Sequence, residues 1–107
     1  MPHMTYEILQ LRDLRTPYAF MNYEYAKSHQ LSLDDYDSVY VGQLDDSDMP
    51  LEAILEFLYL TFNINRPSDF TGHCLSVSDV VIVNKKRYLY CDDAGWKIFY
   101  PDHVARA

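Results

Sequence analysis

The sequence is short of basic residues and of long apolar runs, and each shortage excludes a class of function. Nine lysines and arginines stand against sixteen aspartates and glutamates, which gives a net charge of −7. Binding to nucleic acid through its phosphates needs a basic surface, so we expect no direct nucleic-acid contact. No apolar run reaches the roughly 20 residues of a membrane-spanning helix, so we expect no membrane partner. An acidic chain favours a basic protein as its partner.

Cysteine is also scarce, since Cys74 and Cys91 are the only two. Two cysteines cannot form a tetrahedral zinc site, and the histidines His29, His73 and His103 are scattered along the chain. We therefore predict no metal site and no cofactor. Because no secretory signal is visible, both cysteines are interpreted as buried free thiols of a cytoplasmic protein.

What is present indicates one packed domain. Of the 107 residues, 49% are hydrophobic and 15% are aromatic, which is typical of a globular core. We predict a single domain over residues 5–101, with residues 1–4 interpreted as a cloning scar and start and residues 102–107 as a flexible tail. The ten tyrosines either build the edge of the core or form a recognition surface.

The C-terminal part predicts a three-stranded antiparallel meander. Runs of β-branched and aromatic residues are separated there by two turns rich in Asn, Asp and Lys. The expected strands are Asp79–Val83, Arg87–Cys91 and Trp96–Tyr100, the last with Trp96, Ile98 and Tyr100 on one face. Such a sheet commonly packs one face and exposes the other to water.

An amphipathic helix from Pro50 to Phe62 is expected to cover the meander. Ser47 or Asp48 is the predicted cap, and Pro50 suits the first turn. The apolar stripe consists of Leu51, Ile54, Leu55, Leu58 and Phe62.

Three further elements complete an α+β fold with a curved antiparallel sheet. Within the strand Tyr36–Leu44, Gly42 is expected to mark a bulge or the end of the strand. The elements are a strand at Thr5–Leu11, a second, short helix at Tyr18–His29 and a strand at Tyr36–Leu44.

His73, Ser76, Ser78 and Asp79 are the residue types of a hydrolytic triad. The surrounding sequence has neither a nucleophile elbow nor a glycine-rich oxyanion loop. Short polar side chains before a strand more often bond to nearby backbone groups. We therefore expect a non-enzymatic protein, with a hydrolase or nuclease centred on His73 and Asp79 as the alternative.

The acidic residues are concentrated in one stretch. Between Ser28 and Asn65 there is no lysine or arginine, and half of the sixteen acidic residues lie there. The stretch is either a solvated face or a binding surface for a basic partner. The predicted partner-binding residues are Asp34, Asp35, Asp37, Asp45, Asp46, Asp48, Glu52 and Glu56.

Residues 33–100 resemble the YodL-like domain. The run GHCLSVSDVV at residues 72–81 is similar to that family's signature G-H-S-L-S-V-S-D-V-V, and the runs DDYDSVY at 34–40 and FNINRPSDF at 62–70 also match. DDAGW at 92–96 is similar to the usual D-S-F-G-F. Cys74, Asp93 and Ala94 depart from the family pattern, so the resemblance assigns them no role.

The resemblance implies an accessory protein of bacterial mobile elements such as conjugative elements, plasmids and phages, without enzymatic activity. Small acidic proteins of such elements often disarm host defences. The expected function is therefore an anti-CRISPR-type inhibitor of a nucleic-acid-handling defence factor, with an effector nuclease such as Cas9 as the best single candidate. The carboxylates from Asp34 to Glu56 would mimic nucleic acid in a basic groove. A second alternative is an assembly domain of a mobile-element complex that makes contact through tyrosine-rich edges.

Overall fold

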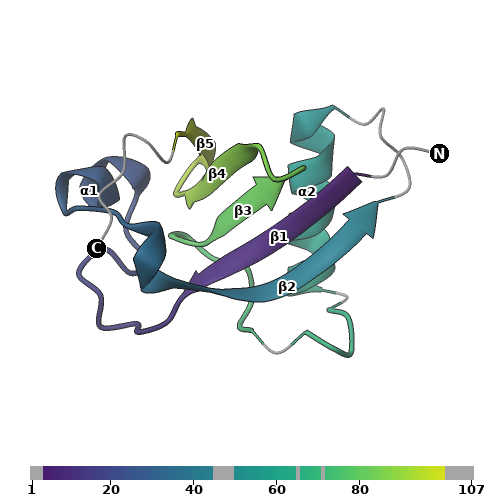
Figure 1. Ribbon diagram of the computed structural model, residues 1–107, viewed down its shortest axis with the longest axis horizontal. Coiled ribbons are helices and arrows are strands. Elements are labelled where there is room, and N and C mark those ends of the chain that lie inside the picture. The colour runs from purple at the N-terminus through teal and green to yellow at the C-terminus, as the bar shows by residue number, and fades with distance from the viewer. Residues whose placement is uncertain (1–3, 45–49, 65, 71, 101–107) are drawn as a thin grey trace.

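A five-stranded antiparallel sheet carries the fold, with a helix on each of its faces (Figure 1). The computed structural model describes residues 4–44, 50–64, 66–70 and 72–100. The strand order is β2-β1-β3-β4-β5, so the predicted α+β class is confirmed. In chain order the elements are β1 (Met4–Leu11), α1 (Tyr23–Ser28), the 3₁₀ turn η1 (Leu33–Asp35), β2 (Tyr36–Leu44), α2 (Leu51–Asn63), β3 (Val80–Val83), β4 (Arg87–Asp92) and β5 (Gly95–Phe99).

The C-terminal meander is present as predicted, with strand bounds that differ by one residue at several ends. Val80 of β3 pairs with Tyr90 of β4, and Cys91 of β4 pairs with Trp96 of β5. β1 pairs with both β2 and β3, so it joins the meander to the remaining strand. The predicted scar at residues 1–3 and the tail at 102–107 lie outside the described residues, whereas Met4 begins β1.

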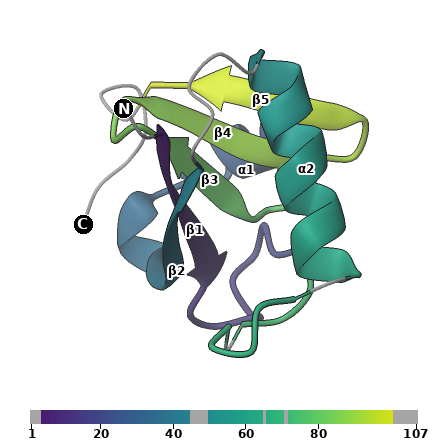
Figure 2. The same ribbon diagram turned by 90° about the vertical axis from the view of Figure 1, so that its right-hand side faces the viewer.

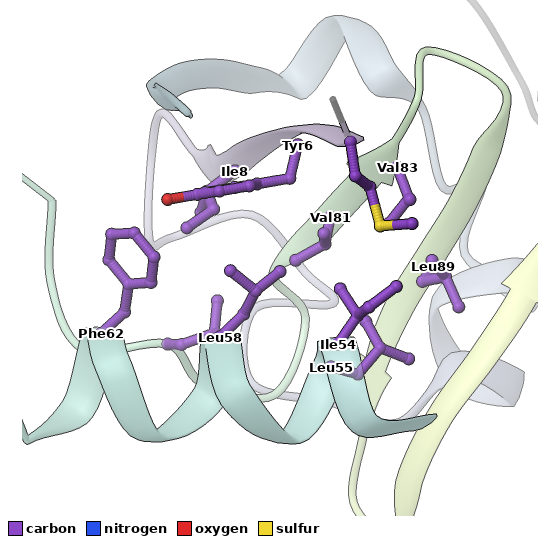
Figure 3. Close-up of a cluster of buried hydrophobic side chains, with 11 residues drawn as sticks. Tyr6, Ile8, Ile54, Leu55, Leu58, Phe62, Val81, Val83 and Leu89 are labelled. Carbon is purple, nitrogen blue, oxygen red and sulfur yellow. The ribbon is translucent and has the colours of Figure 1, made fainter. Parts of the chain in front are cut away.

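α2 covers one face of the sheet through the predicted apolar stripe (Figure 3). Ile54, Leu55, Leu58 and Phe62 are buried and Leu51 is half-buried. Their partners on the sheet lie on β1 as well as on the meander, because β1 supplies apolar side chains to the same core. Pro50 stands at the N-cap without a side-chain bond, and the predicted caps Ser47 and Asp48 lie outside the described residues. The partners on the sheet are Met4, Tyr6, Ile8, Val81, Val83 and Leu89.

The expectation that the other face is wet is wrong for half of that face. Apolar side chains point to both sides of the sheet here, so the chain between β1 and β2 folds back over the second face. At the far end the face is open, where Thr5, Gln43 and Lys85 border a groove of about 460 Å³. The second core consists of Leu9, Leu11, Tyr18, Ala26, Leu31, Tyr36, Val80, Tyr90 and Phe99.

The predicted helix over Tyr18–His29 is shortened to α1, Tyr23–Ser28. Phe20 has a φ of 63°, which interrupts helical geometry before Asn22. The side chain of Asn22 then caps α1 by accepting the Tyr25 N–H at 2.9 Å. Tyr18 lies in the second core instead, and its hydroxyl donates to Asp35 at 2.8 Å.

The bulge in β2 falls at Val39 and not at Gly42. Ile8 pairs with Tyr40 while Leu9 pairs with Ser38, which leaves Val39 as the extra residue. Val39 and Tyr40 consequently both pack on the α2 side. Gly42 has a different role, because a Cβ there would lie 2.5 Å from the Tyr6 hydroxyl oxygen.

The tyrosines mainly build the two cores. Tyr59 and Tyr100 are exposed, and the other eight of the ten are buried or half-buried. Tyr23 contacts both Tyr90 and Phe99 through its ring, which ties α1 to β4 and β5. The tyrosine-rich surface that an assembly domain would use is therefore small.

The burial of α2 leads to a stability prediction. Leu58 is 0% exposed and Leu55 is 4% exposed, so replacing either by alanine should lower the free energy of unfolding by about 2–5 kcal/mol through the cavity it leaves. The matched control is Leu60→Ala on the same helix, since Leu60 is 46% exposed and should change it by less than about 0.5 kcal/mol. Urea unfolding measures all three variants. Equal midpoints would mean that α2 does not close the core.

Candidate functional site

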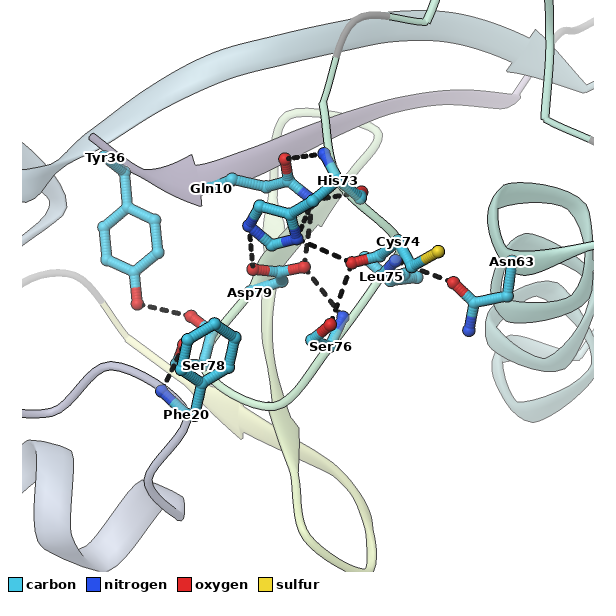
Figure 4. A network of polar contacts seen from close by, with 10 residues as sticks. All are labelled: Gln10, Phe20, Tyr36, Asn63, His73, Cys74, Leu75, Ser76, Ser78 and Asp79. Atoms are coloured by element: carbon cyan, nitrogen blue, oxygen red, sulfur yellow. Dashed lines mark hydrogen bonds and ion pairs between the residues drawn. The ribbon is translucent and has the colours of Figure 1, made fainter. Parts of the chain in front are cut away.

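The signature segment, residues 72–79, is held against β1 by one buried glutamine (Figure 4). Gln10 is 3% exposed, and its Nε2 donates to the His73 carbonyl at 2.8 Å and to Asp79 Oδ2 at 3.1 Å. Its Oε1 accepts the His73 backbone N–H at 3.1 Å. A Cβ at Gly72 would lie 2.3 Å from that Oε1, so this close approach requires glycine.

Asp79 is the buried acid at the centre of these contacts, with 1% of its surface exposed. Its Oδ2 also accepts the Ser76 N–H at 2.8 Å, and its carbonyl accepts the Cys91 N–H at 2.8 Å. Burial raises the pKa of Asp79 from 3.8 to about 7, although the Ser76 N–H, His73 and Gln10 oppose the rise. The carboxyl is therefore a proton-holding group close to neutral pH.

Ser78 connects the segment to the second core. It has a φ of 84°, which is a strained conformation for a residue with a side chain. Its carbonyl accepts the Tyr36 hydroxyl at 2.6 Å, and its Oγ accepts the Phe20 N–H at 3.0 Å. On the other side, Asn63 of α2 accepts the Leu75 N–H at 2.7 Å. The signature segment therefore links both cores.

The predicted hydrolytic residues are close together but are bonded in other ways. The Ser76 hydroxyl donates to the Cys74 carbonyl at 2.9 Å, and neither Ser76 nor Ser78 is hydrogen-bonded to the His73 ring. His73 Nδ1 lies 2.7 Å from the Cys74 carbonyl, while its buried Nε2 has no hydrogen-bond partner and lies 4.0 Å from Asp79 Oδ1. The imidazole and the carboxyl are therefore neighbours without a hydrogen bond between Nε2 and Oδ1, and the two serines bond to backbone groups.

The cysteine prediction is half right. Both cysteines are free, and Cys91 is buried, which raises the pKa of its thiol to about 12. Cys74 is exposed, contrary to the prediction, because residue 74 turns outward while His73 and Leu75 face the fold.

The acidic stretch divides between two separate regions, since η1 and the start of β2 lie apart from α2 (Figures 1 and 2). Asp34, Asp35 and Asp37 lie at η1 and the start of β2, beside the second core. Asp35 accepts the Tyr18 hydroxyl, and Asp37 forms an ion pair with Arg12 at 2.9 Å. The other predicted residues are Glu52 and Glu56, both exposed on α2, and those outside the described residues are Asp45, Asp46 and Asp48.

A groove that the sequence did not reveal runs between α2 and the β4–β5 hairpin. Its two halves measure about 300 Å³ and about 330 Å³, and both are lined by Glu56, Gly95 and Trp96. Asp93 lines one half and Glu52 the other. Only the folding of the hairpin against α2 places these residues together, so no sequence spacing could have indicated the groove.

A second surface was also missed, although the sequence did contain a signal for it. Phe57 and Leu60 are exposed on α2 and Ile64 is exposed at its C-cap, and together with Ala53 they recur at intervals of four, three and four residues. That spacing places them on one side of the helix. The prediction concerned only the apolar stripe of α2 that packs on the sheet, here called the inner stripe.

Within residues 4–44, 50–64, 66–70 and 72–100, no group of three or more His, Cys, Asp or Glu is placed to hold a metal ion. Over the same ranges, the helices are too short or too polar to cross a membrane.

A family model described as the YodL-like domain matches residues 5–100. The chain belongs to the YodL-like domain family. The match includes β1 and α1 as well as the segment from residue 33 onward that carries the resemblance. Curated proteins and solved structures gave no match to this chain. In this YodL-like domain, the signature residues 72–79 are those that bond β1, β2, β4 and α2 to one another.

The raised pKa of Asp79 predicts a pH-dependent stability. Between about pH 4 and pH 7 the folded domain keeps this proton whereas the unfolded chain has released it, so the free energy of unfolding should fall as the pH rises through that window. The fall should be on the order of a few kcal/mol. Asp79→Asn keeps an oxygen that can accept the Ser76 N–H but cannot ionise, so its stability profile should be flatter.

Urea unfolding at a series of pH values measures this effect. Asp93→Asn is the matched control, because Asp93 is exposed and its replacement should leave the profile of the wild type. An Asp79→Asn profile as steep as that of the wild type would contradict the assignment.

Proposed function

We propose that this YodL-like domain is a non-enzymatic binding protein that inhibits a basic, nucleic-acid-handling protein of the host. The observation that carries the proposal is the exposure of its carboxylates: Asp34, Asp37, Glu52 and Glu56 all lie on the surface. In the finer form of the proposal, the domain acts for a mobile element against a CRISPR effector nuclease such as Cas9.

The charge of Glu52 and Glu56 is left without a compensating ion pair among the described residues. Among the described residues, Asp37 has an ion pair with Arg12, whereas neither Glu52 nor Glu56 has one with another described residue. The segment from residue 28 to residue 65 contains no lysine or arginine. Uncompensated charge opposes folding through self-repulsion, so its retention is consistent with a use in attracting a partner.

Competition with phosphate groups is the mechanism that such a surface supports. Nuclease channels present lysine and arginine side chains that hold the nucleic-acid backbone. A rigid surface of carboxylates can occupy the same side chains and displace the nucleic acid. The signature residues support the non-enzymatic part of the proposal, since Ser76 and Ser78 are bonded to backbone groups.

The proposal predicts a salt-sensitive complex with purified Cas9. Binding should weaken from low to high ionic strength, because exposed charges are screened beyond about 8 Å at physiological salt. Excess domain should reduce target cleavage when added before the guide or the target. His73→Ala serves as a control: if it still folds, it should inhibit like the wild type.

Two charge-reversed variants locate the active side. Asp34→Lys with Asp37→Lys and Glu52→Lys with Glu56→Lys change the net charge equally, the first at η1 and the start of β2 and the second on α2. The variant whose reversed residues face the nuclease should bind it about tenfold or more weakly, and the other variant should show a small effect. Unfolding midpoints verify that both variants fold. Unchanged cleavage would exclude the nuclease as target, and binding that is indifferent to salt and to both reversals would exclude the charge mechanism.

A further inference from the structure

The outer side of α2 carries an apolar stripe with no partner in the described structure. Phe57 is 44% exposed, Leu60 is 46% exposed and Ile64 is 71% exposed, and the half-buried Ala53 continues the row. These four residues, here called the outer stripe, lie away from the inner stripe that packs on the sheet. Figure 2 shows α2 standing free along one side of the molecule. Large apolar side chains aligned in this way are typical of a protein-binding surface.

The outer stripe is bordered by negative charge. Glu52 and Glu56 lie between it and the groove that α2 forms with the β4–β5 hairpin. Asp93 and Trp96 line the far wall of that groove. No lysine or arginine is among the described residues that line either half. The apolar surface and the acidic groove therefore adjoin along the part of α2 that lines the groove, residues 51–59.

We propose that the outer stripe and the adjoining groove form the docking surface for an arginine-bearing amphipathic segment of a protein partner. The proposal rests on the function proposed above and names the face and the kind of segment that it binds. Apolar side chains of the segment would cover Phe57, Leu60 and Ile64, while its arginines would enter the groove.

The chemistry of the groove favours arginine over lysine. A guanidinium group is planar, so it can stack on the ring of Trp96 while it donates paired hydrogen bonds to a carboxylate such as Glu56 or Asp93. A lysine ammonium is a compact, strongly hydrated charge that cannot make both contacts equally well.

Charge also distinguishes this partner from a second copy of the chain. Two copies packed through the outer stripe would bring together the carboxylates Glu52 and Glu56 of both, in a chain whose net charge is already −7. Like charges placed opposite each other oppose association. A basic partner neutralises the same carboxylates.

The test uses a synthetic helical peptide, free of tryptophan, with a leucine stripe flanked by arginines. Trp96 is the only tryptophan of the chain and lines the groove, so its fluorescence reports binding at this place. The peptide should change the fluorescence with saturation, and a peptide with lysine in place of arginine should bind several-fold more weakly. A peptide with glutamate in those positions should not bind.

Variants test the surface itself. Phe57→Ser with Leu60→Ser should weaken binding of the arginine peptide by about tenfold. Leu14→Ser with Val41→Ser is the matched control, since Leu14 is 51% exposed and Val41 is 66% exposed, both away from α2. Glu56→Gln should also weaken binding, whereas Glu24→Gln on α1 should not.

Each outcome has a definite meaning. Selective loss in the α2 variants supports the docking surface, whereas absent binding, equal loss in the control variants or no preference for arginine overturns it. A dimer that Phe57→Ser with Leu60→Ser dissociates, measured by light scattering without peptide, would assign the stripe to a second copy and also overturn the proposal. If Cas9 binding persists in the Phe57→Ser, Leu60→Ser variant but is lost in the Asp34→Lys, Asp37→Lys variant, the proposed function stands and this surface does not.

Discussion

The burial of one carboxyl group, that of Asp79, is the constraint on which the rest of the domain depends. A buried acid must find hydrogen-bond donors, and Gln10 of β1 and the Ser76 N–H provide them. Satisfying Asp79 therefore brings the segment after α2 against the central strand. The same segment then reaches Tyr36 through Ser78 and α2 through Leu75, so both cores are joined at one place. In this chain, residues 72–79 therefore serve to hold the fold together.

The two cores decide which surfaces remain for binding. The inner stripe of α2 and the folded-back chain between β1 and β2 cover most of the sheet. Most of the tyrosines are buried or half-buried in these two cores. Among the surfaces that stay exposed, η1 is acidic, α2 is acidic and apolar, and the open groove near Thr5 is mixed. Of these three surfaces, α2 is the one that combines acidic charge with a row of exposed apolar side chains.

The acidic stretch shows how a linear pattern can mislead about a surface. Eight acidic residues follow one another without a basic residue, which suggests one continuous face. The fold places η1 and α2 apart, so Asp34 and Glu56 do not belong to one continuous face. In exchange, the fold places Glu56 beside Asp93 and Trp96, which are far away in the sequence. The charges of neighbouring residues add up along the chain, whereas tertiary packing decides which of them share a surface.

Local sequence patterns determined those features of the fold that depend on residues close together in the chain. The alternation in the meander and the inner stripe of α2 were sufficient to predict those elements and their buried faces, because side-chain periodicity reflects burial directly. Tertiary packing decided the rest: Phe20 and Asn22 shortened α1, the second core covered a face expected to be wet, and Gly42 made room for Tyr6. These outcomes depend on which side chains meet across the sheet. A sequence records each residue's preferences but not the partner that satisfies them.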